Sequence, residues 1–506
     1  MANGLPQPAP RSVALSDLVS GLSDARVLGD PNAIIRGITY DSRLVGPGAL
    51  FAALPGADFD GHDYIGRAVA AGAAALLVER PSQVAVPQIV VRDSREALAS
   101  VANAFYGNPS LELSLIGVTG TDGKTTTSFL VDHLLRTAGL VTGTIGTVGI
   151  RIGPDIAYEL PHQTTPESNL LQGYLREMVE RGVSHAVVEA TSHGLAMHRL
   201  DGTRFSIAAV TNMTHEHLEY HGTVENYWRA KAVLVERVAA NAGTVVLNAD
   251  DAGAMSALPY AGNADVVTTS GSGNPADLVA TDREIRPNGT SFTLHVDEEV
   301  HQVAMPLVGG FNIDNALTAI AVGRAAGLPV GPMVAALATA AGVPGRMQTI
   351  DEGQPFTVIV DYAHTPESLR KVLTLLREMG TGRIIVVSGS AGERDPSKRP
   401  LQGAVCTELA DLSIFANEDP RNEDPLAILD DIAAGARARG AVDGRDYLVV
   451  PDRRAAIARA FAEAQPGDIV LLAGKGHETS IIVGYDHTPW DEVAVARGLL
   501  RERHDA

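Results

Sequence analysis

The sequence is poor in cysteine and has no long apolar run. Cys406 is the only cysteine among 506 residues, so no internal disulfide can form and we expect a reducing compartment. No segment holds the roughly 20 consecutive apolar residues that a membrane-spanning helix needs, and residues 1–11 lack the apolar core of a secretory signal. These absences predict a cytoplasmic protein without a membrane partner.

Positive charge is also in deficit. The chain has 40 Lys and Arg against 60 Asp and Glu, which gives a formal net charge of -20 at pH 7. This balance argues against a nucleic-acid partner, but it allows local basic pockets for an anionic substrate. The remaining composition is that of a globular protein, with 45% hydrophobic, 20% charged and only 5% aromatic residues. The length predicts two to four domains.

The strongest signal is a glycine-rich loop between a predicted strand, residues 113–116, and a predicted helix. It reads Gly117-Val118-Thr119-Gly120-Thr121-Asp122-Gly123-Lys124-Thr125-Thr126-Thr127. Such a loop wraps phosphates with backbone N–H groups, while Lys124 reaches the β and γ phosphates and Thr125 ligates magnesium. Val118 stands where a standard phosphate loop has a glycine, but a turn that merely caps a helix would give no reason for Lys124. The predicted ATP site comprises Gly120, Thr121, Asp122, Gly123, Lys124, Thr125 and Thr126.

Further polar groups lie at predicted strand ends between about residues 111 and 343. The strand His185 to Glu189 ends in a carboxylate, as expected of a magnesium ligand beside a phosphate loop. Residues 212–222 hold three histidines and two glutamates within seven positions, which predicts a metal or phosphate site. A helix cap with solvated histidines is the alternative, since His-Glu-x-x-His spacing is absent. Lys231 lies in a helical stretch, where a surface lysine is the ordinary interpretation.

Predicted strands alternate with helices from about residue 344 to 506. The strands are Thr357–Val360, Arg383–Val387, Leu412–Phe415, Tyr447–Val450 and Asp468–Leu472. This alternation predicts a parallel, doubly wound sheet whose functional groups gather at the carboxyl ends of its strands. Loops 361–366, 391–395, 418–425 and 474–478 mix Arg, Lys, His and carboxylates. That mixture suits a zwitterion such as an amino acid, although each loop alone is also typical of a solvated turn.

The region before about residue 110 alternates short strands with Ala-rich helices. Its distinctive motifs are Thr39-Tyr40-Asp41-Ser42-Arg43 and Phe59-Asp60-Gly61-His62. Taken alone, Asp41-Ser42 is best explained as a turn and Arg43 as a solvated charge. We therefore predict an α/β protein of three domains, residues 1–110, residues 111–343 with the phosphate loop, and residues 344–506 with a Rossmann-like doubly wound sheet.

In their order and spacing these motifs resemble those of the Mur ligases, which build the peptide of bacterial peptidoglycan, and specifically the MurE type. The resemblance covers nearly the whole chain. It rests on Thr119–Thr125, Thr164–Glu167, Glu189 with Thr191–His193, His217–Gly222, Tyr227–Lys231, Gly310–Asn312, Gly345-Arg346, Asp361–Pro366 and Gly474–Glu478.

The resemblance implies an ATP-dependent ligase that phosphorylates a substrate carboxylate and lets an amine attack the acyl phosphate. Magnesium and cationic side chains would offset the repulsion between carboxylate and ATP. Lys124, Lys231 and His217 are the implied catalytic residues, with Thr125, Glu189, His217 and Lys231 as metal ligands. Lys231 would act as a carbamate, which displaces the surface-lysine interpretation. Asn312, Arg346, Asp361 and His364 are the further ATP contacts implied, the last two supplied when the third domain closes.

The resemblance also implies the other substrates. UDP-N-acetylmuramoyl-L-alanyl-D-glutamate would be held by Ser42, Arg43, Thr164, Thr165, Thr191 and Arg199. Met197 stands where the family commonly has a polar residue, so it receives no role. The incoming diamino acid would be held by Arg394, Glu418, Asp419, Arg421, Gly474 and Glu478.

The residues 418–421 bear on which diamino acid is added. MurE enzymes that add meso-2,6-diaminopimelate usually read Asp-Asn-Pro-Arg, whereas this chain reads Glu418-Asp419-Pro420-Arg421. Arg421 favours the distal carboxylate of meso-diaminopimelate, which we slightly prefer. The two acidic replacements favour the terminal ammonium of L-lysine or L-ornithine, which remain open.

Two other functions fit parts of the sequence. A folylpolyglutamate synthase-like ligase would share the ATP-binding core but lack the nucleotide-sugar region before residue 110. A phosphate-loop ATPase of a non-ligase class would leave the loops after residue 360 unexplained. We expect a monomer.

Overall fold

The computed structural model describes residues 8–56, 59–157, 163–214, 216–286, 289–380 and 382–504. By compactness the chain divides into two units. The first comprises Met1–Thr281, Leu294–His301 and Asp314–Leu337, and the second comprises Asp282–Thr293, Gln302–Ile313 and Ala338–Ala506. Among the described residues, no helix has the length and apolarity needed to cross a membrane.

The first unit begins with a five-stranded sheet in the order β2-β7-β6-β5-β4. The strands are β2 (Arg26–Leu28), β7 (Gln88–Val90), β6 (Ala73–Val78), β5 (Ala49–Ala52) and β4 (Gly37–Thr39). β4 to β7 pair in parallel, and helix α3 (Ser94–Phe105) packs its apolar residues against the sheet. Thr39 therefore ends a parallel strand, which places the following Asp41-Ser42-Arg43 turn at a carboxyl edge of the sheet.

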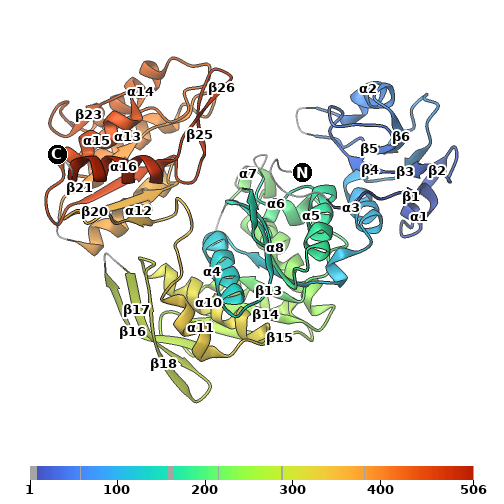
Figure 1. Ribbon diagram of the computed structural model, residues 1–506, viewed down its shortest axis with the longest axis horizontal. Coiled ribbons are helices and arrows are strands. Elements are labelled where there is room, and N and C mark those ends of the chain that lie inside the picture. The colour runs from blue at the N-terminus through green and yellow to red at the C-terminus, as the bar shows by residue number, and fades with distance from the viewer. Residues whose placement is uncertain are drawn as a thin grey trace. The chain divides into compact units, whose positions relative to one another are not determined.

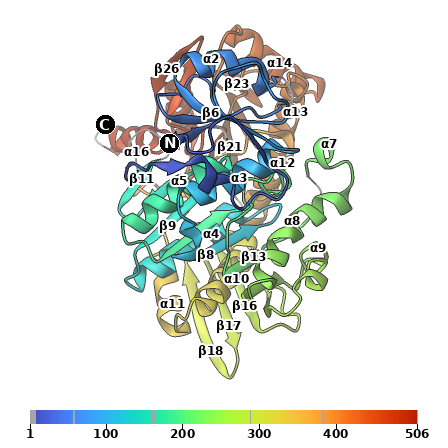
Figure 2. The same cartoon turned by 90° about the vertical axis from the view of Figure 1, so that its right-hand side faces the viewer.

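An eleven-stranded sheet follows, in the order β11-β10-β9-β12-β8-β13-β14-β15-β16-β17-β18. Its strands are β8 (Ser114–Thr119), β9 (Thr142–Gly146), β10 (Gly149–Ile152), β11 (Asp155–Ala157), β12 (His185–Glu189), β13 (Ile207–Val210), β14 (Thr244–Asn248), β15 (Asp265–Ser270), β16 (Leu278–Arg286), β17 (Gly289–Val296) and β18 (Glu299–Met305). Strands β9, β12, β8, β13, β14 and β15 pair in parallel. Helix α4 (Lys124–Thr137) packs beside β8, β9 and β12 (Figure 2).

The other helices that carry predicted residues in this region are α5 (Ser168–Glu180), α6 (Ser192–Ala196), α8 (Val224–Ala239) and α10 (Phe311–Ala325). The strand before the phosphate loop, the strand ending at Glu189, the helix around Lys231 and the helix opened by residues 309–315 are thus confirmed.

The second unit contains a six-stranded sheet in the order β19-β20-β24-β21-β22-β23. Its strands are β19 (Gln348–Ile350), β20 (Thr357–Asp361), β21 (Ile384–Ser388), β22 (Leu412–Phe415), β23 (Tyr447–Val449) and β24 (Ile469–Ala473). All but β19 run parallel. The predicted strands agree with the structure to within one residue at each end.

Helices cover both faces of this sheet (Figure 1). They are α12 (Pro366–Met379), α13 (Lys398–Leu409), α14 (Pro425–Ala438), α15 (Arg453–Glu463) and α16 (Glu492–His504). Alternate residues of the strands face the two layers: Val358 and Val360 pack with α15 and α16, whereas Ile359 packs with α12 to α14. The predicted doubly wound sheet is therefore confirmed.

Candidate functional site

The glycine-rich loop connects the end of β8 to the start of α4 and is closed by its neighbours. Gly120 and Gly123 have φ angles of 147° and 84°, a region that favours glycine. A Cβ at Gly120 would lie 1.9 Å from the Thr211 hydroxyl oxygen, so only glycine fits there. Lys124 Nζ donates to the carbonyl oxygens of Gly120 and Thr121 at 2.9 and 2.8 Å. The loop therefore presents the positive helix start and an ammonium group at one place, as a phosphate site requires.

Glu189 lies against this loop at the end of β12. Its carboxylate is buried and accepts a hydrogen bond from the Thr125 hydroxyl at 2.9 Å. Burial raises the pKa of Glu189, and the nearby Lys124 charge opposes that rise. Two predicted magnesium ligands, Thr125 and Glu189, are thus within hydrogen-bonding distance of each other.

Lys231 is 2% exposed and points from α8 toward the phosphate loop. Its amine donates to the Gly120 carbonyl oxygen, and Nζ lies 4.6 Å from the centre of the Tyr227 ring. Burial lowers the pKa of Lys231 well below its ordinary value of 10.5, and the Lys124 charge lowers it further. The surface-lysine interpretation is wrong, because this amine is enclosed and biased toward its neutral form.

His217 lies beside the loop that follows β12. Its ring centre is 4.6 Å from that of His193 in α6, and its Nε2 lies 3.8 Å from the Glu216 carboxylate. Tyr227 joins this segment to the phosphate loop through a 2.9 Å contact between its hydroxyl and that of Thr121. His215, another histidine of the predicted site, lies outside the described residues.

No three His, Cys, Asp or Glu side chains gather closely enough to hold a metal ion by themselves in the described part of the chain. Magnesium in nucleotide sites takes one or two carboxylates together with phosphate oxygens and water. Thr125 and Glu189 supply oxygen donors of that kind.

The predicted nucleotide-sugar contacts of the central region form one cluster around Glu189. The Thr165 hydroxyl donates to the Glu189 carbonyl oxygen at 2.6 Å and contacts the Thr191 hydroxyl at 3.0 Å. Arg199 Nη1 donates to the Thr165 carbonyl oxygen at 3.0 Å. Thr164 lies one residue away in the same loop. The structure therefore brings all four residues together.

Two residues without a predicted role, Glu167 and Arg95, complete that cluster. Glu167 is 5% exposed, and its Oε1 accepts from Arg95 at 2.9 Å and from Arg199 at 3.1 Å. Burial and the Glu167 charge raise the pKa of Tyr40, which precedes the Asp41-Ser42-Arg43 turn. Glu167 belongs to the Thr-Thr-Pro-Glu motif, but the sequence alone does not indicate its arginine partners, because they are distant along the chain.

Ser42 and Arg43 lie in the turn after β4. Arg43 is 74% exposed and pairs with Asp41 at 2.7 Å, so the turn interpretation describes its local structure. The motif around Asp60 has a structural role. Asp60 accepts hydrogen bonds from the His62 backbone and ring at 2.9 and 2.7 Å, and His62 Nε2 accepts one from the Glu79 backbone at 3.1 Å.

In the second unit, Arg346, Asp361 and His364 surround Tyr362. The Arg346 guanidinium lies 5.1 Å from the Tyr362 ring centre, and the His364 ring lies 4.6 Å from it. Asp361 accepts from the backbone of Met347 and Ala363 at 2.8 Å each. Burial raises the pKa of Asp361 and lowers that of His364. The three predicted residues are thus neighbours.

Asn312 lies in the first turn of α10, is 2% exposed and donates to the Val308 carbonyl oxygen at 2.8 Å. Asn315 of the same helix, which was not predicted, accepts from the Thr127 hydroxyl at 3.2 Å. A Cβ at Gly123 would lie 2.4 Å from its Oδ1, so α10 closes against the phosphate loop at Asn315.

The predicted amino-acid residues gather at the carboxyl ends of β22 and β24. Lys475, which had no predicted role, donates to Asp419 at 2.9 Å and to Glu478 at 2.6 Å. Asp419 also accepts from the Ile482 backbone at 2.9 Å. The extra negative charge expected from Asp419 is therefore already paired inside the protein.

Glu418 lies beside Gly474 and is 6% exposed. A Cβ at Gly474 would lie 2.7 Å from Glu418 Oε2, a buried oxygen that has no hydrogen-bond partner among the described residues. Burial raises the pKa of Glu418 to about 7, although Arg453 and Lys475 oppose the rise. Arg421 is half-buried, and in the described part of the chain its Nε also meets no hydrogen-bond acceptor. Arg394 lies exposed in the loop after β21.

The raised pKa of Glu418 predicts a pH-dependent cost to stability. Below the ordinary value of 4.5 Glu418 is protonated in both the folded and unfolded states, whereas above about 7 folding buries a charge. Stability is therefore lost as pH rises through this window. We expect Glu418→Gln to stabilise the protein by up to about 3 kcal/mol more at pH 8 than at pH 5. Urea unfolding at both pH values tests this, with the exposed Glu502→Gln as control; equal effects at both pH values would contradict it.

Comparison with known proteins identifies the family of the chain. Three family models match: "Mur ligase family, catalytic domain" over residues 34–106, "Mur ligase middle domain" over 118–323, and "Mur ligase, glutamate ligase domain" over 345–476. A UDP-N-acetylmuramyl-tripeptide synthetase of Roseiflexus sp. (strain RS-1) is 45% identical over 96% of this chain and 99% of that protein.

Two further proteins named as UDP-N-acetylmuramoyl-L-alanyl-D-glutamate--2,6-diaminopimelate ligases are similar. The one from Geobacillus kaustophilus (strain HTA426) is 43% identical over 94% of this chain and 96% of its own. A solved structure of such a ligase has a TM-score of 0.69 and 31% identity, and it covers 98% of this chain and 100% of its own. The chain therefore belongs to the Mur ligase family, as a MurE-type, ATP-dependent amide ligase of peptidoglycan biosynthesis.

Proposed function

We propose that the protein adds meso-2,6-diaminopimelate to UDP-N-acetylmuramoyl-L-alanyl-D-glutamate. The observation that carries the choice of amino acid is the pairing of Asp419 with Lys475. Because Asp419 is paired and the pKa of Glu418 is raised to about 7, the two acidic replacements add less negative charge than the sequence indicated. Arg421 has a buried Nε that no described residue hydrogen-bonds, and its positive charge favours a distal carboxylate over a distal ammonium.

In the first step, a substrate carboxylate oxygen attacks the γ-phosphorus of ATP and the bond to ADP breaks. Lys124 and the backbone N–H groups of the phosphate loop would hold the phosphates. Thr125, Glu189 and His217 would hold magnesium, which offsets the charge on the phosphates. In the second step, the amine attacks the acyl phosphate, loses a proton, and inorganic phosphate leaves as the amide forms.

The buried amine of Lys231 supports its proposed conversion to a carbamate. Carbon dioxide reacts with a neutral amine, and burial together with Lys124 lowers the pKa of Lys231 toward that form. The product would be a carboxylate-like oxygen donor beside the phosphate loop at Gly120. It would also place a negative charge near Gly120 and Lys124, which suits a site for magnesium.

On the nucleotide-sugar side, Arg199 would bind the substrate while Glu167 holds its guanidinium. We expect Glu167→Gln to raise the KM for the nucleotide-sugar about tenfold with a smaller change in kcat, because the buried Arg199 and the half-buried Arg95 lose their shared anion. The measurement is steady-state kinetics with the nucleotide-sugar varied. Glu112→Gln breaks a comparable ion pair with Arg176 away from the cluster; a similar KM change there would argue against a role at the site.

Phosphate release and product mass test the proposed reaction. ATP, magnesium and the UDP-linked muramoyl dipeptide would be combined with meso-diaminopimelate, L-lysine or L-ornithine in separate reactions. Turnover with meso-diaminopimelate alone is expected. Turnover with lysine or ornithine instead would mean that Glu418 and Asp419 set the choice. We also propose that the enzyme acts as a monomer in the cytoplasm, which size-exclusion chromatography with light scattering and cell fractionation test.

A further inference from the structure

A turn that no sequence motif singled out holds the Glu189 carboxylate. It joins β9 to β10, and Thr147 lies at its centre. The Thr147 backbone N–H donates to Glu189 Oε1 at 3.1 Å, and its hydroxyl donates to Oε2 at 3.0 Å. One residue thus grips both carboxylate oxygens, which fixes the rotation of the carboxylate plane.

The close approach of this turn depends on Gly146. A Cβ at Gly146 would lie 2.1 Å from Glu189 Oε1. A larger residue would push the turn away from the carboxylate, so the grip by Thr147 requires glycine at the preceding position. Glu189 Oε2 also accepts from the Thr125 hydroxyl at 2.9 Å, so Thr125 and Thr147 meet at the same oxygen.

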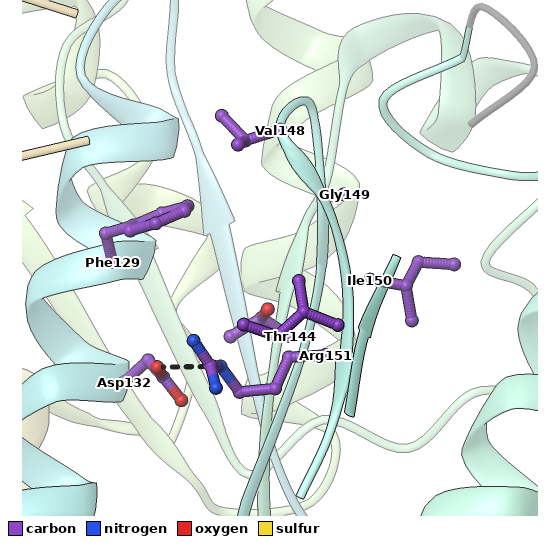
Figure 3. A pocket seen from close by; sticks show the side chains of 8 residues that line it. Phe129, Asp132, Thr144, Val148, Gly149, Ile150 and Arg151 are labelled. Atoms are coloured by element: carbon purple, nitrogen blue, oxygen red, sulfur yellow. Dashed lines mark ion pairs between the residues drawn. The ribbon is translucent and has the colours of Figure 1, made fainter. Parts of the chain in front are cut away.

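The hairpin that carries the turn is tied to the phosphate-loop helix. Asp132 of α4 accepts from the Thr142 hydroxyl of β9 and pairs with Arg151 of β10 at 3.4 Å. Figure 3 shows this ion pair below Val148 of the turn and Gly149 of β10, with Phe129 of α4 and Thr144 lining the same small pocket. Both strands of the hairpin are therefore anchored to the helix that begins at Lys124.

The Thr147 hydroxyl has a second neighbour, the Thr164 hydroxyl at 3.0 Å. A hydroxyl has one proton to donate, and Thr147 gives it to Glu189, so Thr164 must be the donor in the contact between the two threonines. The resulting chain runs from Thr164 through Thr147 to Glu189. It connects a proposed nucleotide-sugar contact to a proposed magnesium ligand.

We propose that Thr147 is a positioning residue that orients Glu189 for magnesium and couples it to the nucleotide-sugar contact at Thr164. This inference rests on the proposed role of Glu189 as a magnesium ligand. Residues that hold a metal-ligating carboxylate typically change metal affinity by about 10- to 100-fold when they are removed.

The test is Mn2+ binding in the presence of ADP, measured by electron paramagnetic resonance on the full chain. We expect Thr147→Val to weaken Mn2+ binding about tenfold, because it loses the hydroxyl but keeps the backbone N–H. Thr147→Ser should restore the affinity. Thr144→Val, which alters the neighbouring strand without touching Glu189, should bind as the wild type does, and thermal melting of each variant identifies any loss of folding.

Glu189→Gln separates the two proposals. If Glu189→Gln leaves Mn2+ affinity unchanged, Glu189 is not a metal ligand and the proposed function loses that residue. If Glu189→Gln weakens binding while Thr147→Val does not, the inference about Thr147 is overturned. Coupling to Thr164 requires that the effects of Thr147→Val and Thr164→Val on the KM for the nucleotide-sugar be non-additive in the double variant; additive effects would remove the coupling.

Discussion

Replacing Lys231 with alanine is expected to lower the rate of phosphate release about 10³-fold or more, because the proposed carbamate, a charged magnesium ligand, could no longer form. Lys231→Arg should not restore activity. Arginine keeps a positive charge and cannot become a carbamate, and it would force a guanidinium into a space where Lys231 is 2% exposed and close to Lys124.

The carbamate itself has a separate readout. Carbon-13 NMR of enzyme kept in labelled bicarbonate should show a carbamate signal in the wild type that Lys231→Ala lacks. Removing carbon dioxide from the buffer should lower wild-type activity reversibly. Lys371→Ala removes an exposed lysine and serves as the control. Full activity in Lys231→Ala or Lys231→Arg would contradict the proposal that Lys231 acts as a carbamate.

The sequence predicts those parts of the site that depend on local order along the chain. A strand, a glycine-rich loop and a helix follow one another, so the phosphate loop could be recognised from residues 113–135 alone. The position of Glu189 beside the phosphate loop could be predicted because it ends a strand, and parallel strands deliver their last residues to one edge of the sheet. Lys231 was different: only the resemblance gave it a role, and the structure supplies the burial that makes the role physically reasonable.

Local sequence patterns do not predict the contacts that set the position and charge of these residues. Thr147 reaches Glu189 across 42 positions, and Arg95 reaches Glu167 across 72. Lys475 pairs with Asp419 across 56 positions, and this pair changes the charge that the amino-acid pocket offers. Periodicity and spacing report which face of an element is buried, but they do not report which distant side chain meets a given carboxylate. The motifs around Asp41 and Asp60 pose the same problem. Without their hydrogen bonds, the sequence does not tell which of their residues are structural and which bind substrate.

Arg421→Gln is expected to raise the KM for meso-diaminopimelate about 100-fold, because a substrate carboxylate would lose a charged partner in a partly buried pocket. Glutamine keeps much of the side-chain length of arginine. The φ angle of 53° at position 421 is as unusual for glutamine as it is for arginine, so the change adds no backbone strain. The KM for ATP and for the nucleotide-sugar should change little, since the residues proposed for those substrates are elsewhere in the sequence.

The control for this change is Arg445→Gln, which removes an exposed arginine that pairs with Asp446 at 2.6 Å. Steady-state kinetics with the three diamino acids should show that Arg421→Gln has a weaker preference for meso-diaminopimelate over L-lysine and L-ornithine than the wild type has. If it instead uses meso-diaminopimelate as well as the wild type does, selection must come from another group, and Arg394 in the loop after β21 becomes the next residue to change.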